Sequence, residues 1–227
     1  MKVTPILLAV LYALAMYRFS VWRTKRELDA KSTELADGRL LRALAPMADA
    51  LGVERIRVMV YEIATVNGLA APDGRIFVTR GFLRKYQQGE VTAEEMASVV
   101  AHEIGHVALG HSRRRMIDFS GQNAVRVMLM GIIGRFVPGV GPWIANALVS
   151  MLAAGLSRKD EYEADAYATA LMAKAGLPVA AQKSLFRRLE SLTGAAGAGV
   201  PAWLMSHPKV DDRIQAIEAN ERRWELA

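Results

Sequence analysis

The sequence predicts an α+β fold that is mainly α-helical, with a small β-hairpin or sheet beside a central helix. Amphipathic and apolar stretches with helix-type start signals cover most of the 227 residues. β-branched residues are concentrated in two short runs, 55–66 and 75–81, and the turn-forming segment 67–74 separates them. The sequence has no internal repeats and no second-domain boundary, so we expect one domain with an N-terminal appendage.

Start and stop signals predict the helices. The first covers 27–51 and ends at an Ala-Leu-Gly sequence. The central helix opens at a capping box, with Thr92 at the N-cap and Glu95 three residues later. It runs toward His111, where Gly110 and a run of basic residues suit a helix end. Further helices are predicted at 158–175, near 179–192 and after Pro208.

Residues 1–26 form a membrane anchor or a signal segment, and residues 27–227 form the main domain. The stretch 3–22 is almost entirely apolar and is barely long enough to span a bilayer, which requires ~20 residues. Basic residues follow it, so a retained anchor predicts a cytoplasmic domain by the positive-inside rule. A cleaved signal peptide predicts export to the periplasm or cell envelope instead.

A second apolar segment covers 124–156 and carries only two charges, both arginines. Two prolines and two glycines interrupt it near its middle. We therefore predict a hairpin of two short helices, 124–136 and 142–156. This hairpin is buried in the domain, dips into a membrane or forms a lid.

The composition excludes some classes of site and partner. The chain has no cysteine, which excludes disulfides and thiolate metal sites. Its net charge of +6 favours an anionic surface as a partner. Basic residues cluster beside the apolar segments and no nucleic-acid motif is present, so we expect a membrane and no nucleic acid.

The stretch AHEIGHVALGH, residues 101–111, holds three of the four histidines. His102 and His106 are four residues apart and share one helix face, ~6 Å apart along the axis, so both imidazoles can reach one zinc ion. Glu103 stands beside the metal without having to bind it, and can accept a proton from a water there. This is the H-E-x-x-H pattern of zinc peptidases.

Two histidines do not complete a catalytic zinc site, which usually has three protein ligands. His111 is the candidate nearest in sequence for the third ligand, but it is five residues after His106 and faces a different way, so we expect it to be a helix-end cap or a surface residue. Glu161 and Asp165 share a face of a later predicted helix. One of them can bind zinc while the other accepts a hydrogen bond from a ligand histidine. Glu163 is expected to point away and meet solvent.

H-E-x-x-H followed some fifty residues later by S-R-x-x-E-x-x-A-D resembles the HtpX-like and CAAX prenyl protease-like zinc metallopeptidases, of gluzincin type. The stretches VNGLAAPDGRIFVTRGFL, 66–83, and SHPKVDDRI, 206–214, resemble two further segments of that family. The resemblance reaches from about residue 40 to 218. The resemblance is to the compact members of the family that have a single anchor, because this sequence lacks the several long spanning helices of the other members.

The resemblance implies a zincin-like domain holding one Zn²⁺ per chain. It assigns Glu161 as the third zinc ligand and Asp165 as its neighbour that orients a histidine. His207 and Arg213 are implied as donors to the developing oxyanion, and His207 could instead block the zinc. The segment at Asn67 and Gly68 is implied to lie beside the cleft, where an extended peptide could add as a strand. Gly68 departs from the family's usual alanine.

The function predicted is that of a membrane-associated zinc metalloendopeptidase acting on proteins or peptides, in envelope protein quality control. Membrane contact is predicted through 3–22 and 124–156. A catalytically silent chaperone or adaptor on the same fold is the alternative, and the intact Glu103 argues against it. The substrate and the oligomeric state are not predicted.

Overall fold

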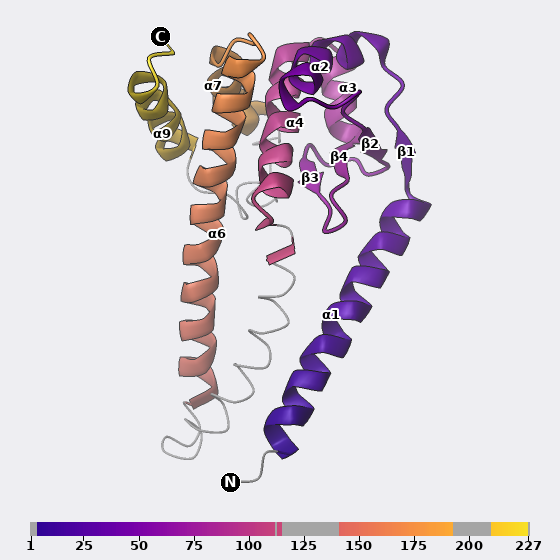
Figure 1. Ribbon diagram of the computed structural model, residues 1–227, viewed down its shortest axis with the longest axis vertical. Coiled ribbons are helices and arrows are strands. Elements are labelled where there is room, and N and C mark those ends of the chain that lie inside the picture. Colours follow the sequence, from indigo (N-terminus) through magenta and orange to yellow (C-terminus); the bar gives the residue numbers. More distant parts are fainter. Residues whose placement is uncertain (1–3, 112, 115–140, 193–209, 227) are drawn as a thin grey trace.

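The computed structural model describes residues 4–111, 113–114, 141–192 and 210–226. In these parts of the chain, most residues are helical and a small four-stranded sheet lies to one side of α4, Ala93–Ala108 (Figure 1). The predicted α+β class, mainly helical, is confirmed. The elements in chain order are α1 Thr4–Ala30, β1 Ser32–Glu34, α2 Gly38–Leu51, β2 Val58–Tyr61, β3 Gly68–Ala70, β4 Ile76–Thr79, α3 Arg80–Gln87, α4 Ala93–Ala108, α6 Gly141–Lys174, α7 Ala180–Leu192 and α9 Val210–Arg223.

The sheet differs from the predicted hairpin. Its order is β1-β2-β4-β3, and the two predicted strands, β2 and β4, pair in parallel, with Val58 opposite Ile76. The chain between them returns as β3, which pairs antiparallel with β4. This short strand lies in 67–74, where the composition predicted turn residues, and with β4 it forms an antiparallel hairpin within 66–83, the segment that resembles a hairpin of the family. Within the described sheet, β3 is therefore an edge strand.

The single helix predicted over 27–51 is wrong. α1 continues to Ala30, β1 follows, and α2 begins only at Gly38. The reason is a new N-cap: the carboxylate of Asp37 accepts hydrogen bonds from the backbone N–H groups of Arg39 and Leu40. The left-handed Gly52, with φ of 69°, then ends α2 as predicted.

The two helices predicted at 142–156 and 158–175 are one continuous helix, α6, of 34 residues. No proline interrupts the stretch near Ser157, and the helix continues through Gly155 and through Ser157, which could have served as an N-cap. The predicted helix 124–136 lies outside the described residues. α7 and α9 agree with the predicted helices near 179–192 and after Pro208.

α4 is the central element of the fold. It packs against α6, α7 and α2, and on another side against β3 and β4 (Figure 1). Its residues Met96, Ala97, Val100 and Ala101 are fully buried. Most polar side chains of α4 are consequently buried: Glu95, Ser98, His102, Glu103 and His106.

α1 extends away from the rest of the described structure (Figure 1). It presents exposed apolar side chains at Leu7, Leu11, Leu14, Phe19 and Trp22. Among the helices that the structure describes, none is both long and apolar enough to cross a bilayer. The predicted spanning anchor over 3–22 is therefore not confirmed.

Candidate metal centre

The helix that carries the histidine motif, α4, begins at the expected capping box. The Thr92 hydroxyl accepts from the Glu95 N–H at 3.1 Å, and the Glu95 carboxylate accepts from the Thr92 N–H at 2.9 Å. The capping box predicted from the sequence is thus confirmed. Further along the same helix, His102 and His106 lie on one face because they are four residues apart, and both are buried.

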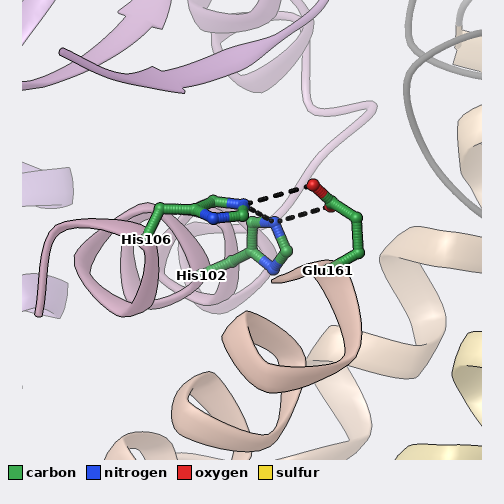
Figure 2. A group of neighbouring side chains, drawn as sticks. All are labelled: His102, His106 and Glu161. Carbon is green, nitrogen blue, oxygen red and sulfur yellow. Dashed lines mark hydrogen bonds and ion pairs between the residues drawn. The ribbon is translucent and has the colours of Figure 1, made fainter. Parts of the chain in front are cut away.

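Three side chains from two helices converge at one point (Figure 2). The Nε2 atoms of His102 and His106 are 3.1 Å apart. Glu161 on α6 faces both of them: its Oε2 lies 3.3 Å from His102 Nε2, and its Oε1 lies 3.4 Å from His106 Nε2. The sequence separation of more than fifty residues is closed by the packing of α6 on α4.

This donor set fits a zinc ion. With metal–ligand distances of ~2.0–2.1 Å, neighbouring ligands of a tetrahedral site lie roughly 3.3–3.4 Å apart. The separations of 3.1, 3.3 and 3.4 Å, the last two to different oxygens of Glu161, are close to that spacing. Imidazole and carboxylate are ligands that zinc accepts, and burying them together without a cation would be costly.

A glycine permits the approach of α6 to α4. A Cβ atom at Gly105 would lie 3.1 Å from the Cα and carbonyl oxygen of Ala164 and from Cβ of Tyr167. Ala164 is fully buried and lies three residues after Glu161. The small residues at 105 and 164 therefore set how closely Glu161 approaches the two histidines.

Asp165 lies behind His102, with its Oδ1 2.9 Å from His102 Nδ1. The Arg213 guanidinium of α9 donates two hydrogen bonds of 2.7 Å to the Asp165 carboxylate. It also stacks over the ring of Phe186, 4.2 Å from the centroid. Because Nδ1 of His102 faces Asp165, it is Nε2 that faces Glu161 and His106, where a metal would bind.

The charges around His102 shift its protonation. Burial lowers the pKa of His102, but hydrogen bonds to Asp165 and Glu161 outweigh burial and raise it from 6.5 to about 9. Burial raises the pKa of Asp165, but the Arg213 and His102 contacts outweigh it, so the net pKa falls below the ordinary value. Asp165 is therefore an anionic hydrogen-bond acceptor for His102.

His111 is not a surface residue, and that prediction was wrong. Its side chain is 0% exposed, and its Nδ1 lies 3.0 Å from Nδ1 of His106. Its Nε2 lies 3.1 Å from Oε2 of Glu163. Glu163 therefore does not simply point to solvent: its side chain is 38% exposed and its carboxylate reaches inward to His111.

The sequence contained a signal from which the contact between His111 and His106 could have been predicted. Gly110 was expected to end α4, and it has φ of 71°, the left-handed conformation that reverses the chain. The reversal turns His111 back toward the preceding turn, where His106 lies. Periodicity alone assigns a residue five positions away to another face. It fails here because α4 ends at Ala108.

A hollow lies beside Glu103, and the segment predicted to border the cleft lines it. Its walls include Asn67, Gly68, His102, Glu103 and Arg213. A Cβ at Gly68 would lie 2.6 Å from Cγ1 of Val99 and 3.2 Å from Oε1 of Glu103. β3 thus approaches α4 so closely that only glycine fits there without displacement of the helix side chains.

Two predicted oxyanion donors have different outcomes in the structure. Arg213 is 1% exposed, and its guanidinium is held by Asp165, while it also borders the hollow. His207 lies outside the described residues.

An H-E-x-x-H helix whose two histidines meet a glutamate from a second helix defines a metallopeptidase. The chain matches the model of Peptidase family M48 over residues 34–221, which is most of its length. It belongs to that family, and it is a metalloendopeptidase, a hydrolase of peptide bonds.

Relatives with curated names agree with this assignment. Metalloprotease LoiP of Escherichia coli is 30% identical over 200 residues, covering 85% of this chain and 75% of LoiP. Protease HtpX of Pseudomonas aeruginosa is 28% identical over 219 residues, covering 81% of this chain and 72% of HtpX. The human mitochondrial metalloendopeptidase OMA1 is 27% identical over 180 residues, which cover 75% of this chain and 33% of OMA1.

Proposed function

We propose that this chain is a zinc-dependent endopeptidase with one Zn²⁺ held by His102, His106 and Glu161. The observation that carries the proposal is the meeting of their side chains in a buried site: the two histidine Nε2 atoms are 3.1 Å apart, and the two oxygens of Glu161 lie 3.3 and 3.4 Å from them. Three protein ligands leave one tetrahedral position for water, as catalytic zinc sites require. The coarser assignment, a metalloprotease acting on proteins or peptides, follows from the family.

Glu103 is the proposed general base. Zinc in this site would lower the pKa of the attacking water and polarise the scissile carbonyl. Glu103 follows His102 on α4 and borders the hollow beside the ligands. It accepts the proton of the attacking water and passes it to the leaving amine. Loss of such a group typically costs ~10²–10⁴-fold in rate.

The substrate is proposed to bind along β3. This strand has β4 on one side, and within the described sheet its other edge has no strand partner. An extended peptide can pair with such an edge through main-chain hydrogen bonds. Asn67 and Gly68 lie at the start of this edge and line the hollow beside Glu103. A peptide bond on this edge would therefore lie next to the base.

Arg213 is proposed to act through Asp165. Its two hydrogen bonds to that carboxylate, together with its burial, favour positioning of the His102 ring over direct contact with substrate. The oxyanion role predicted for Arg213 would require its guanidinium to donate a hydrogen bond to the substrate in the hollow as well. His207 stays a prediction, as an oxyanion donor or as a ligand that blocks the zinc.

Membrane association is proposed through residues 3–22 and through 124–156. The exposed apolar side chains of α1 support the first contact, together with the basic residues that follow them. A cytoplasmic domain is the proposed location, and export to the cell envelope is the alternative. A role in envelope protein quality control is part of this proposal. Carbonate extraction of membranes, with and without residues 3–22, tests the first contact.

Hydrolysis of casein by the wild type and by Glu103→Gln tests the proposed function, with zinc content measured on the same samples. We expect the wild type to cleave casein and Glu103→Gln to bind zinc without cleaving. His106→Ala and Glu161→Gln should both weaken zinc binding, because each removes one donor. Equal inactivity of wild type and Glu103→Gln, with zinc bound to both, would favour the chaperone or adaptor. Unchanged zinc in Glu161→Gln would reject the third ligand.

A further inference from the structure

We propose that His111 is a positioning residue for His106. Its ring links His106 by hydrogen bonds to the Glu163 carboxylate, which thereby fixes the His106 ring and raises its basicity at the metal site. The inference rests on the proposed function, because it assumes that His106 Nε2 binds zinc. It assigns a role to a buried histidine that the ligand set and the general base leave unused.

The end of α4 builds this contact. The helix stops at Ala108, Leu109 is its C-cap, and Gly110 takes the left-handed conformation with φ of 71°. A residue with a side chain would be strained at that φ. The reversal buries the His111 ring completely, against the ring of His106 at a centroid distance of 5.2 Å.

The hydrogen-bond pattern has one solution when His106 binds a metal. Metal binding at Nε2 requires that the proton of His106 be on Nδ1. That Nδ1–H lies 3.0 Å from Nδ1 of His111, which must then be the acceptor. The proton of His111 is consequently on Nε2, which donates to Oε2 of Glu163 at 3.1 Å. Each ring thereby fixes the tautomer of its neighbour.

The two ligand histidines are thus oriented by different devices. His102 donates directly to Asp165, which Arg213 holds. On its Nδ1 side, His106 faces a second imidazole, His111, whose Nε2 lies against the Glu163 carboxylate. Hydrogen bonds of this kind raise the basicity of a ligand histidine and fix its ring. Both histidines therefore have a carboxylate on the side opposite the metal, one directly and one through a relay.

A second cation is the competing interpretation of the same residues. His111, Asp160 and Glu163 also bring donor atoms within 4.8 Å of one another. However, cations of the chain already lie against both carboxylates: Arg114 Nη1 is 3.6 Å from Asp160, and Lys159 Nζ is 3.5 Å from Glu163. The contacts favour the relay.

Zinc affinity of a matched pair of variants tests the inference. Asn and Leu have nearly the same shape, but only Asn offers an oxygen near the position of His111 Nδ1. We expect His111→Leu to weaken zinc binding ~10–100-fold, as loss of such a hydrogen bond usually does. His111→Asn should keep most of the affinity. Competition with a chromophoric chelator measures both, and absorption of the cobalt(II)-substituted proteins should be altered in His111→Leu alone.

Glu163→Met supplies a variant that leaves the buried ring in place. Its side chain is partly exposed, so we expect unchanged folding and a smaller loss of zinc affinity than in His111→Leu. Wild-type affinity in both His111→Leu and Glu163→Met would overturn the inference. Equal loss in His111→Asn and His111→Leu, or two zinc ions per wild-type chain, would also overturn it. Failure of the wild type to bind zinc would instead reject the proposed function and the inference together.

Discussion

Arg213 of α9 and Asp165 of α6 form a buried ion pair with two hydrogen bonds of 2.7 Å, although 48 residues separate them in the chain. Both side chains are 1% exposed. The same Asp165 carboxylate accepts from His102 at 2.9 Å. The last helix of the fold is thereby tied to the ring that is proposed to bind zinc. This ion pair gives Arg213, in the stretch 206–214 that resembles the family, a structural role.

Asp165→Ala is predicted to destabilise the protein by ~3–5 kcal/mol, because it leaves the Arg213 charge buried without its carboxylate. Urea unfolding in the presence of a chelator measures the loss without the contribution of zinc. The double variant Asp165→Ala/Arg213→Met is the control, since removal of both charges abolishes the desolvation penalty. A double variant no more stable than Asp165→Ala would show that the pair is not the cause.

Loss of the capping box at Thr92 is predicted to lower the stability of the protein and to leave zinc binding unchanged. Thr92→Ala removes the acceptor for the Glu95 N–H and should cost ~1 kcal/mol of unfolding free energy, as N-cap losses do. Thr92→Ser keeps the hydroxyl and should retain the wild-type stability. Zinc stoichiometry of the folded protein should stay at the wild-type value in both. Loss of zinc in Thr92→Ala would mean that the start of α4 controls the site itself.

Local signals predicted the α+β class and the central helix, because a capping box and a four-residue spacing each depend only on residues that are close together in the sequence. The strand partners could not be predicted, since the pairing of β2 with β4 depends on the path of the chain between them. β1 and the new start at Asp37 were missed because three extended residues between two helices leave almost no periodicity. His111 was misplaced because the reversal at Gly110, not the helix period, decides where its ring points.

Gly105→Val is predicted to weaken zinc binding by separating α4 from α6. Even a Cβ at this position would lie 3.1 Å from Ala164, so a branched side chain must displace α6 and Glu161 with it. Overpacking of this kind usually costs ~1–3 kcal/mol. Gly38→Val is the matched control, because the nearest atom to its Cβ is the flexible end of Arg42 at 3.7 Å. Equal zinc affinity of the two variants would contradict the prediction.

Gly68→Ala is predicted to slow peptide hydrolysis while zinc stays bound. The added Cβ would lie 2.6 Å from Cγ1 of Val99 and 3.2 Å from the Glu103 carboxylate, so β3 or the proposed base must move. The three ligands lie on α4 and α6 and do not depend on this contact. We therefore expect lower kcat for casein or a quenched peptide, with one zinc per chain.

Val99→Ala supplies the internal control for this prediction. It removes the atom that lies nearest to the new Cβ, so Gly68→Ala/Val99→Ala should recover much of the activity lost in Gly68→Ala. Val99→Ala alone should be close to wild type, since Val99 is only partly buried. A double variant as slow as Gly68→Ala would show that the activity is lost through displacement of Glu103, whose carboxylate lies 3.2 Å from the added methyl group. Full activity of Gly68→Ala would show that β3 moves freely away from α4, against the close packing seen in the structure.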